Sequence, residues 1–320
     1  MLSPERMLPL ESESEARVAI LMAVLNGEKF LDDQFRSLEA QTIPTIDIWA
    51  SDDGSSDGSL ALLKQWQARW KKGHFQILAG PQRGFAENFR SLMMRSDIEA
   101  DFFAFCDQDD IWDEDKLEIA VAQLSQSCAD QAGLYASRTR IIDASGNPVG
   151  VSPLFRKEPS FRNAIVQNIG GGNTMLVNRR AWSIIREGAR RTGFVSHDWW
   201  SYLLVSGAGG QVIYDPTPRT GYRRHEKNLV GDNASIGARI DRLRRLLAGE
   251  FAVWNQRNID SLERCEDLLD ADSRKVFEEF KHIRRLIAFT ALSELMRSGI
   301  RRQTLIDNAA LFSAGMMGKL

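Results

Sequence analysis

Apolar and polar positions follow a repeating pattern over the first 110 residues, in which short apolar runs alternate with longer amphipathic stretches. Each apolar run is four to eight residues long and ends in a polar turn, as expected for a buried strand. The runs are Arg17–Val24, Ile46–Ser51, Phe75–Leu78 and Phe102–Cys106. Between them, apolar residues recur at helical spacing, for example at Leu31, Phe35 and Leu38.

Strands and helices that alternate at this pace predict an α/β fold, with a mostly parallel sheet covered by helices on both faces. In such sheets a ligand binds beyond the carboxyl ends of the strands. Three of the predicted strands end in polar, acidic or Gly-rich loops, namely Asn26–Gly27, Asp52–Gly58 and Asp107–Asp110. We therefore expect these loops to lie together at one edge of the sheet.

The pattern is less regular after Gly133. The elements predicted there are a strand at Thr174–Val177, helices from Arg179 and near Ser196, a short strand at Gln211–Asp215, a polar loop from Tyr222 to Asn228, and helices with arginines on one side from Ile236 onward.

Composition narrows the class of protein. The chain has 320 residues, of which 43% are hydrophobic and 26% charged, as in ordinary globular proteins. A net charge of −2 argues against a partner nucleic acid. No apolar run is long enough to cross a membrane, and residues 1–15 lack the apolar core of a signal peptide. We therefore expect a flexible tail at residues 1–15 and a cytoplasmic protein, with Cys106, Cys128 and Cys265 as reduced thiols.

Acidic residues dominate two of the three loops. Asp107 and Asp109, at positions i and i+2 past a strand, can reach one hard cation, and Mg²⁺ or Mn²⁺ prefers oxygen ligands. The alternative is a solvated acidic turn before a helix. Asp52 and Asp53 can accept hydrogen bonds from a ribose or a base, whereas Asp57 also suits the N-cap of a helix.

Four stretches, in their order and spacing, resemble the family 2 glycosyltransferases, which have the GT-A nucleotide-sugar-binding fold. They are Met22–Gly27, Asp52–Asp57, Arg83–Phe89 and Asp107–Trp112. The resemblance covers roughly the first two-thirds of the chain. It implies an inverting, metal-dependent glycosyltransferase with a GT-A domain at residues 16–235 and a helical C-terminal region at residues 236–320. The nucleotide-sugar half would be residues 16–130, and the acceptor half residues 131–235.

The resemblance also implies roles for individual residues. The nucleotide-sugar would be bound by Asn26, Asp52, Asp53, Arg83, Asn88 and Asp107. Asp109 would be the metal ligand, although Asp110 leaves that assignment ambiguous by one position. Leu25 stands where the family usually has an aromatic residue, so a stacking contact with the base is missing.

In the second half of the chain, the resemblance points to Asp198 as the catalytic base that deprotonates the acceptor hydroxyl. The alternative is a helix N-cap at Asp198 beside a surface His197. Trp199 and Trp200 are candidates for the acceptor site, and we expect one of them to pack in the core and the other to stack on a sugar. His225 would complete the metal site. Arg223, Arg224 and Lys227 would neutralise the departing diphosphate.

Within the family, the motifs look most like bacterial rhamnosyltransferases of polysaccharide assembly. This implies dTDP-rhamnose, or else a UDP-sugar, as donor and a glycan acceptor that is lipid-linked. Arginines among apolar residues of the C-terminal region suit peripheral contact with the inner face of the plasma membrane, or else an amphipathic cap on the domain. Two other functions stay open: a haloacid-dehalogenase-type phosphohydrolase and a non-catalytic nucleotide- or sugar-binding protein. Asp107 lies far from the N-terminus, which argues against the former.

Overall fold

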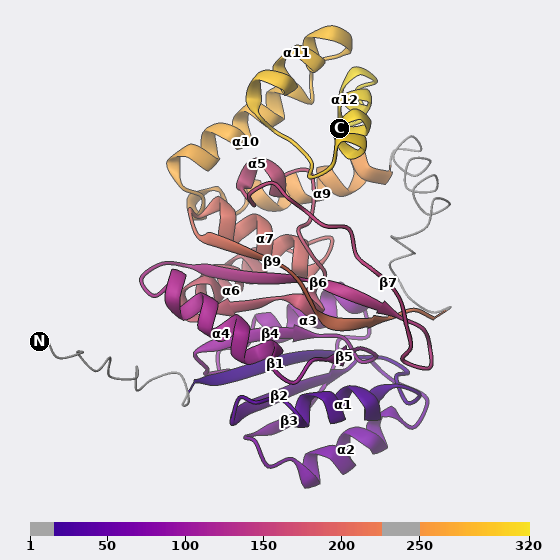
Figure 1. The fold of residues 1–320 in the computed structure, drawn as a ribbon. Coiled ribbons are helices and arrows are strands. Elements are labelled where there is room, and N and C mark those ends of the chain that lie inside the picture. Colours follow the sequence, from indigo (N-terminus) through magenta and orange to yellow (C-terminus); the bar gives the residue numbers. More distant parts are fainter. Residues whose placement is uncertain (1–15, 226–249) are drawn as a thin grey trace, which may run out of the picture.

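The computed structural model describes residues 16–225 and 250–320, and it has the predicted α/β arrangement (Figure 1). The predicted tail at residues 1–15, Lys227 and the predicted domain boundary at residue 235 lie outside the described residues. The division into domains therefore stays a prediction.

The elements are as follows. The strands are β1 (Arg17–Val24), β2 (Thr45–Asp52), β3 (Phe75–Ala79), β4 (Phe102–Cys106), β5 (Ile111–Trp112), β6 (Gly133–Ile142), β7 (Pro148–Val151), β8 (Leu176–Asn178) and β9 (Gln211–Arg223). The α-helices are α1 (Leu31–Glu39), α2 (Ser59–Arg69), α3 (Phe85–Met93), α4 (Lys116–Ser127), α5 (Phe161–Ala164), α6 (Arg179–Arg191), α7 (His197–Gly207), α9 (Glu250–Glu263), α10 (Ala271–Ile283), α11 (Ala288–Ser298) and α12 (Leu305–Met316). Two 3₁₀ turns are η2 (Gly172–Thr174) and η3 (Glu266–Leu268).

The described strands form one nine-stranded sheet in the order β3-β2-β1-β4-β8-β6-β9-β5, and β7 pairs with β6. Strands β1 to β4 are parallel to one another. The short strand β8 runs antiparallel to both of its neighbours, β4 and β6, and β6 is parallel to β9. The prediction of a mostly parallel sheet is thus confirmed, with β8 antiparallel in its middle and the short strands β5 and β7 antiparallel to β9 and β6, respectively.

Both faces of the sheet are covered, which explains the uninterrupted apolar runs of the sequence. Along β1, Val18 and Ile20 belong to one buried cluster, and Ala19 and Leu21 belong to the other. Side chains of α1, α2 and α4 fill the first cluster, whereas α3, α6 and α7 fill the second. The sheet therefore lies between two helical layers (Figure 1).

The C-terminal helices extend the second layer. Phe277 and Phe280 of α10 and Leu295 of α11 belong to the same buried cluster as the side chains of α7. The predicted helical C-terminal extension is therefore present, and it stacks on the side of the sheet that carries α7 (Figure 1). Among the helices of residues 16–225 and 250–320, none combines the length and the apolar character that crossing a bilayer requires.

Four strands differ from the sequence-based expectation. Strand β9 runs to Arg223 instead of ending at Asp215, and the sequence predicted no strand at β5, β6 or β7. Strands β6 and β9 pair with each other along their length, with register shifts around Arg138. Arg138 and Arg140 interrupt the apolar alternation of β6, because their guanidinium groups bond to the Ser152 carbonyl and to an acidic side chain, respectively. A strand of this kind lacks the period-2 signal.

Candidate active site

The three polar loops meet at the carboxyl ends of β1, β2 and β4. The Gln108 side chain binds Leu25 twice, since its Oε1 accepts from the Leu25 N–H (2.8 Å) and its Nε2 donates to the Leu25 carbonyl (3.0 Å). Asn26 Oδ1 accepts a hydrogen bond from the Ser56 N–H (2.8 Å). The predicted convergence of the loops is therefore confirmed.

The two acids of the second loop have different surroundings. Both carboxylate oxygens of Asp53 are engaged, because its Oδ1 accepts from the Gln82 N–H (2.6 Å) and its Oδ2 accepts from the Gly84 N–H (3.0 Å). Asp52 accepts one hydrogen bond through Oδ2, from the Ser55 N–H (3.2 Å), and its Oδ1 is buried with no partner among the described residues. Asp52 is thus the acid with an unused acceptor atom, whereas Asp53 shapes the loop that carries Arg83.

Three further residues predicted to bind the nucleotide-sugar, Asn26, Arg83 and Asn88, lie around this loop. Asn88 is buried, and its amide donates to the Ser51 carbonyl (2.9 Å), so it positions β2 against α3 instead of lining a pocket. The Arg83 side chain is exposed and has no polar partner within residues 16–225 and 250–320. Asn26 has a backbone φ of 50°, a left-handed conformation that Asn tolerates better than most residues.

The two predicted metal ligands are in direct contact. His225 Nε2 lies 2.6 Å from Asp109 Oδ2, although the two residues are 116 positions apart. Both side chains are about 15% exposed, and the imidazole stacks on Phe30 with ring centroids 5.0 Å apart. The structure therefore brings one carboxylate and one imidazole together beyond the carboxyl ends of β4 and β9.

Asp110 has a different role from Asp109. Its carboxylate is fully buried and accepts hydrogen bonds from the Asn173 amide and from the Arg223 N–H (3.2 Å). Its own N–H donates to Gln34 Oε1 (2.9 Å). Asp110 therefore joins α1, η2 and β9 beneath the site, which favours Asp109 over Asp110 as the metal ligand.

Asp110→Ala should destabilise the fold more than Asp109→Ala does. The substitution leaves the Asn173 amide and the Arg223 N–H as buried donors without this acceptor, and each such loss costs about 1–3 kcal/mol. Urea unfolding of the two variants measures the difference. Equal losses of unfolding free energy would contradict a structural role for Asp110.

The expectation that Arg223 neutralises a departing diphosphate is wrong. Its guanidinium group is buried and donates to the carbonyls of Asp109 and Ala144 (2.9 Å each) and to the carboxylate of Asp33 (3.0 Å). It also lies over the Phe30 ring, 4.7 Å from the centroid. Arg223 thus fixes the acidic loop against α1. Neither this partner at Asp33, 190 positions away, nor the burial could be read from local sequence.

Asp107 and Asp198 complete the acidic cluster. Burial and the neighbouring carboxylates of Asp110, Asp109 and Asp198 raise the pKa of Asp107 well above its ordinary value. Asp198 lies in the first turn of α7, where the helix dipole favours a carboxylate, and its Oδ1 accepts from the Trp199 N–H (2.7 Å). The carboxylates of the two halves of the chain thus lie close enough to repel, and a bound cation would relieve that repulsion.

The structure does not support the two tryptophans as acceptor-site residues. Trp199 is 6% exposed and donates to the Ala164 carbonyl (2.7 Å), and Trp200 is fully buried. A sugar-stacking platform needs an open ring face, and neither ring has one. Both side chains belong to the core, so the expectation that one of them stacks on a sugar is wrong in this conformation.

His197 is buried too, contrary to the interpretation as a surface residue. It stacks on Phe89 with centroids 3.7 Å apart, and neither ring nitrogen has a hydrogen-bond partner among the described residues. A Cβ on Gly172 would lie 2.0 Å from its Nε2, so the chain needs glycine there. Burial lowers the pKa of His197 to about 4, and the Asp198 carboxylate opposes this shift only in part.

This burial predicts a pH dependence of stability. Between pH 6.5 and pH 4 the unfolded chain binds a proton at His197 and the folded chain does not, so the free energy of unfolding should fall as the pH falls. The expected loss from this group is roughly 3 kcal/mol across that window. His197→Leu should flatten this part of the curve in urea unfolding. An unchanged slope would mean that His197 is not buried in the neutral form.

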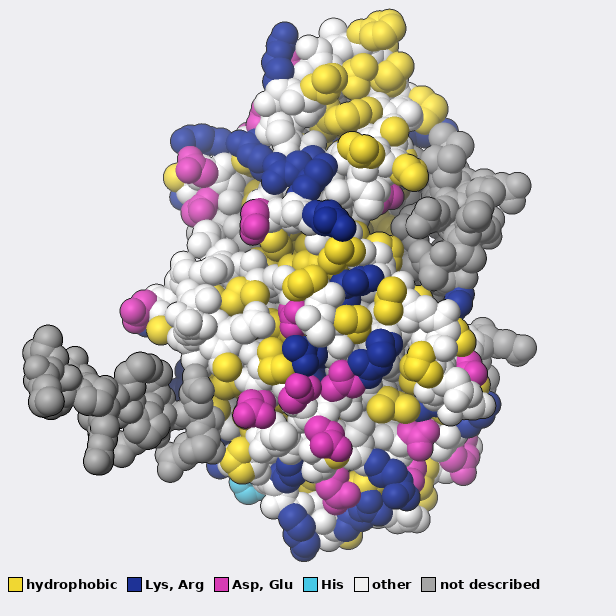
Figure 2. All heavy atoms as spheres, in the orientation of Figure 1, with side chains coloured by type: hydrophobic (Ala, Val, Ile, Leu, Met, Phe, Trp, Pro, Cys, Tyr) yellow, Lys and Arg dark blue, Asp and Glu magenta, His cyan; other side chains and the backbone are white. Residues whose placement is uncertain are grey.

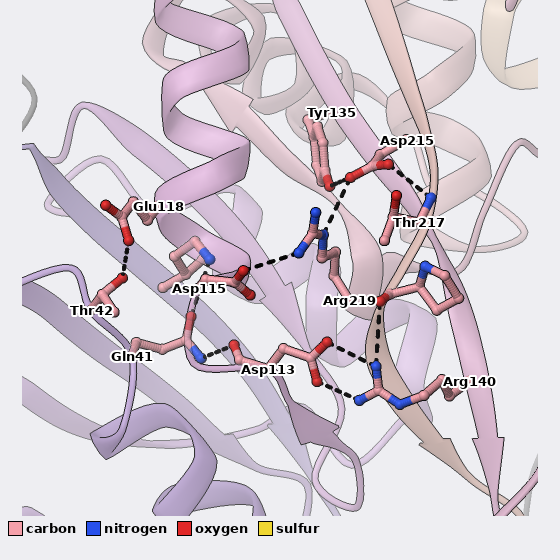
Figure 3. A network of polar contacts seen from close by, with 12 residues as sticks. Gln41, Thr42, Asp113, Asp115, Glu118, Tyr135, Arg140, Asp215, Thr217 and Arg219 are labelled. Atoms are coloured by element: carbon pink, nitrogen blue, oxygen red, sulfur yellow. Dashed lines mark hydrogen bonds and ion pairs between the residues drawn. The ribbon is translucent and has the colours of Figure 1, made fainter.

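A polar network anchors the segment that follows the acidic loop (Figure 3). Asp113 pairs with Arg140 of β6, and Asp115 pairs with Arg219 of β9 (3.0 Å between Oδ2 and Nη1). Arg219 also lies 3.4 Å from Asp215 of the same strand. The acidic loop is thus tied to the far half of the sheet, which holds Asp109 in place opposite His225.

The residues of the site fit a divalent cation that is coordinated partly by the protein and partly by a substrate. The described residues hold no group of three or more His, Cys, Asp or Glu side chains arranged as a complete metal site. Mg²⁺, however, is commonly bound by one or two carboxylates together with substrate phosphates, and a neighbouring imidazole suits Mn²⁺. The pair of Asp109 and His225 provides that donor set.

Comparison with known proteins decides the family. The model of glycosyl transferase family 2 matches residues 19–184, which is more than half of the chain. The chain is a family 2 glycosyltransferase. This family membership, together with glycosyltransferase relatives, replaces the phosphohydrolase and non-catalytic alternatives.

The chain is similar to curated sugar transferases of two bacteria. It is 29% identical over 230 residues to the dTDP-rhamnosyl transferase RfbG of Shigella flexneri, covering 69% of this chain and 78% of that protein. It is 24% identical over 187 residues to the putative teichuronic acid biosynthesis glycosyltransferase TuaG of Bacillus subtilis, covering 58% and 71%, respectively.

Solved structures show the same GT-A fold. S. aureus TarS (residues 1–349) in complex with UDP-GlcNAc superimposes with a TM-score of 0.53 at 13% identity, covering 95% of this chain and 88% of that one. The mannosyltransferase PcManGT of Pyrobaculum calidifontis, in complex with GDP-Man and Mn²⁺, gives a TM-score of 0.53 at 15% identity, covering 96% and 77%. The predicted GT-A fold with C-terminal helices is confirmed.

Proposed function

We propose that this glycosyltransferase transfers L-rhamnose from dTDP-rhamnose, with inversion, to a hydroxyl of a lipid-linked cell-surface polysaccharide in the cytoplasm. The observation that carries the catalytic part is the contact between Asp109 and His225 beside Asp107 and Asp198. Similarity to the dTDP-rhamnosyl transferase RfbG supports the donor. The cluster would thus provide a cation that binds the diphosphate of the donor and a carboxylate that deprotonates the acceptor hydroxyl.

The donor would lie along the carboxyl ends of β1, β2 and β4. The unpaired Oδ1 of Asp52 would accept a hydrogen bond from the nucleoside once a side-chain rotation exposes it, and Asn26 and Arg83 flank the same loop. Asp53 and Asn88 would act through the backbone that they position. Asp107, the acid at the end of β4, would face the ribose.

The chemical step is a single displacement. An Asp198 carboxylate oxygen takes the proton of the acceptor hydroxyl while that hydroxyl oxygen bonds to the anomeric carbon. The bond between the anomeric carbon and the diphosphate oxygen breaks on the opposite face, so dTDP leaves and the configuration inverts. Asp109 and His225 would hold a divalent cation, Mn²⁺ or Mg²⁺, which supplies Lewis-acid stabilisation of the leaving diphosphate.

A transfer assay tests the donor and the product. The purified protein is incubated with Mn²⁺, lipid-linked glycans extracted from bacterial membranes, and in parallel dTDP-rhamnose, UDP-GlcNAc or GDP-mannose. We expect a product heavier by one deoxyhexose only with dTDP-rhamnose, and a preference in kcat/KM of roughly tenfold or more over the other donors. Equal transfer from a UDP-sugar would contradict rhamnose as the donor sugar, but it would not contradict the proposed position of the donor site.

A further inference from the structure

The end of the molecule formed by α11 and α12 exposes large apolar side chains. Leu305 is 85% exposed, Phe289 76%, and Ile306 70%, and Met296 is also mostly exposed. Figure 2 shows hydrophobic side chains gathered over this end, with Lys and Arg side chains near its border. We call the set Ile287, Phe289, Met296, Leu305, Ile306 and Met316 the apolar end face.

The two helices expose these residues because their other sides are already used. Helix α11 packs against α12, with Leu295 and Leu311 buried between the two helices and the layer beneath. They are antiparallel, since Ile287 before α11 lies beside Gly318 after α12. Asp307, the only charged residue of α12, caps the start of that helix by bonding to Thr304. A helix that is apolar on nearly every side is normally buried on all of them, so the side of α12 that α11 leaves open calls for another surface to cover it.

The charge of this region differs from that of the rest of the chain. Residues 284–320 contain six Lys and Arg residues and two acidic residues, a net charge of +4, whereas the whole chain carries −2. The remaining residues therefore carry −6. The basic residues are Arg284, Arg285, Arg297, Arg301, Arg302 and Lys319. Arg285 is exposed, and the Arg297 side chain is 72% exposed beside Glu294.

We propose that the apolar end face docks on the surface of an anionic lipid bilayer, with Phe289, Leu305 and Ile306 inserted at the level of the head groups. Exposed apolar side chains flanked by basic residues are the features that bind an interfacial helix to anionic lipid. A second copy of the chain fits less well, because two regions of +4 would face each other across an isologous contact. The inference rests on the proposed function for its choice of partner, since a lipid-linked acceptor lies at a bilayer.

Vesicle flotation tests the inference, using the full chain and two double variants. Phe289→Glu with Leu305→Glu changes the apolar end face, and Val149→Glu with Val151→Glu is the matched control on the exposed strand β7. The vesicles are phosphatidylcholine alone or with phosphatidylglycerol. We expect the wild type and the control to float with anionic vesicles, less so at high salt, and the end-face variant to bind at least roughly tenfold more weakly.

Three outcomes would overturn the inference. They are equal binding by the end-face variant, no preference for anionic vesicles, and a wild-type dimer in light scattering that the end-face variant abolishes, since the last would assign the face to a second copy. Thermal unfolding and dTDP binding of each variant are measured in parallel. Vesicle binding without dTDP binding would reject the proposed donor and leave the docking face standing, and the reverse result would reject only the docking face.

Discussion

Asp198→Asn should lower the rate of sugar transfer by roughly 10²–10⁴-fold while the affinity for dTDP stays close to that of the wild type. The substitution keeps the size of the side chain and its hydrogen bond from the Trp199 N–H, but it removes the carboxylate that accepts the proton. The nucleotide would bind on the other side of the site, along β1 and β2. Transfer rate at saturating donor and calorimetric dTDP affinity therefore separate the two effects.

Asp130→Asn provides the matched control, because Asp130 is exposed and lies before β6, outside the acidic cluster. This variant should keep wild-type transfer. If Asp198→Asn retains most of its turnover while Asp130→Asn is also normal, Asp198 is not the base, and another carboxylate of the cluster has to be considered. Asp107 would be tested next, since it lies close enough to Asp198 for the two carboxylates to interact.

Asp109→Asn and His225→Ala should each remove most of the metal-dependent part of donor binding and catalysis. The two side chains meet at 2.6 Å, and each provides one of the two donors of the proposed cation site. Metal assistance in such a step is worth several kcal/mol, so we expect transfer to fall by roughly 10²-fold or more in either variant. Chelation of divalent metal should have a similar effect on the wild type and a much smaller additional effect on the variants.

His74→Ala controls for the loss of an imidazole, because His74 is exposed at the start of β3 and contacts Asp47 through its backbone only. The double variant Asp109→Asn with His225→Ala should be little worse than either single variant, since the two residues act through one cation. Fully additive losses would contradict a shared site, and so would wild-type transfer in the presence of chelator.

Much of the fold follows from local patterns. The runs that become β1 to β4 are buried on both faces, so their apolar character is continuous and easily seen. By contrast, β6 contains Arg138 and Arg140, whose partners lie on other segments, and its pairing with β9 includes register shifts. Such a strand is defined by tertiary contacts, which the sequence does not display.

The same distinction holds for the candidate site. The loops after β1, β2 and β4 could be predicted to meet, because parallel strands place their carboxyl ends together. Which carboxylate does what could not be predicted. Asp110 is distinguished from Asp109 by its burial and its hydrogen bonds from Asn173 and the Arg223 N–H, and the guanidinium group of Arg223 is occupied by Asp33. Likewise, Trp199 and Trp200 are adjacent to an acid at the site but face the core, which only the packing of α7 reveals.

Calorimetric titration of the purified protein with dTDP and UDP, each with and without Mn²⁺, tests the central claim most directly. The proposed site predicts binding of dTDP with a dissociation constant on the order of micromolar, in preference to UDP and only when the metal is present. Absence of binding to both nucleotides, with and without Mn²⁺, would contradict a nucleotide-sugar site at the carboxyl ends of β1, β2 and β4.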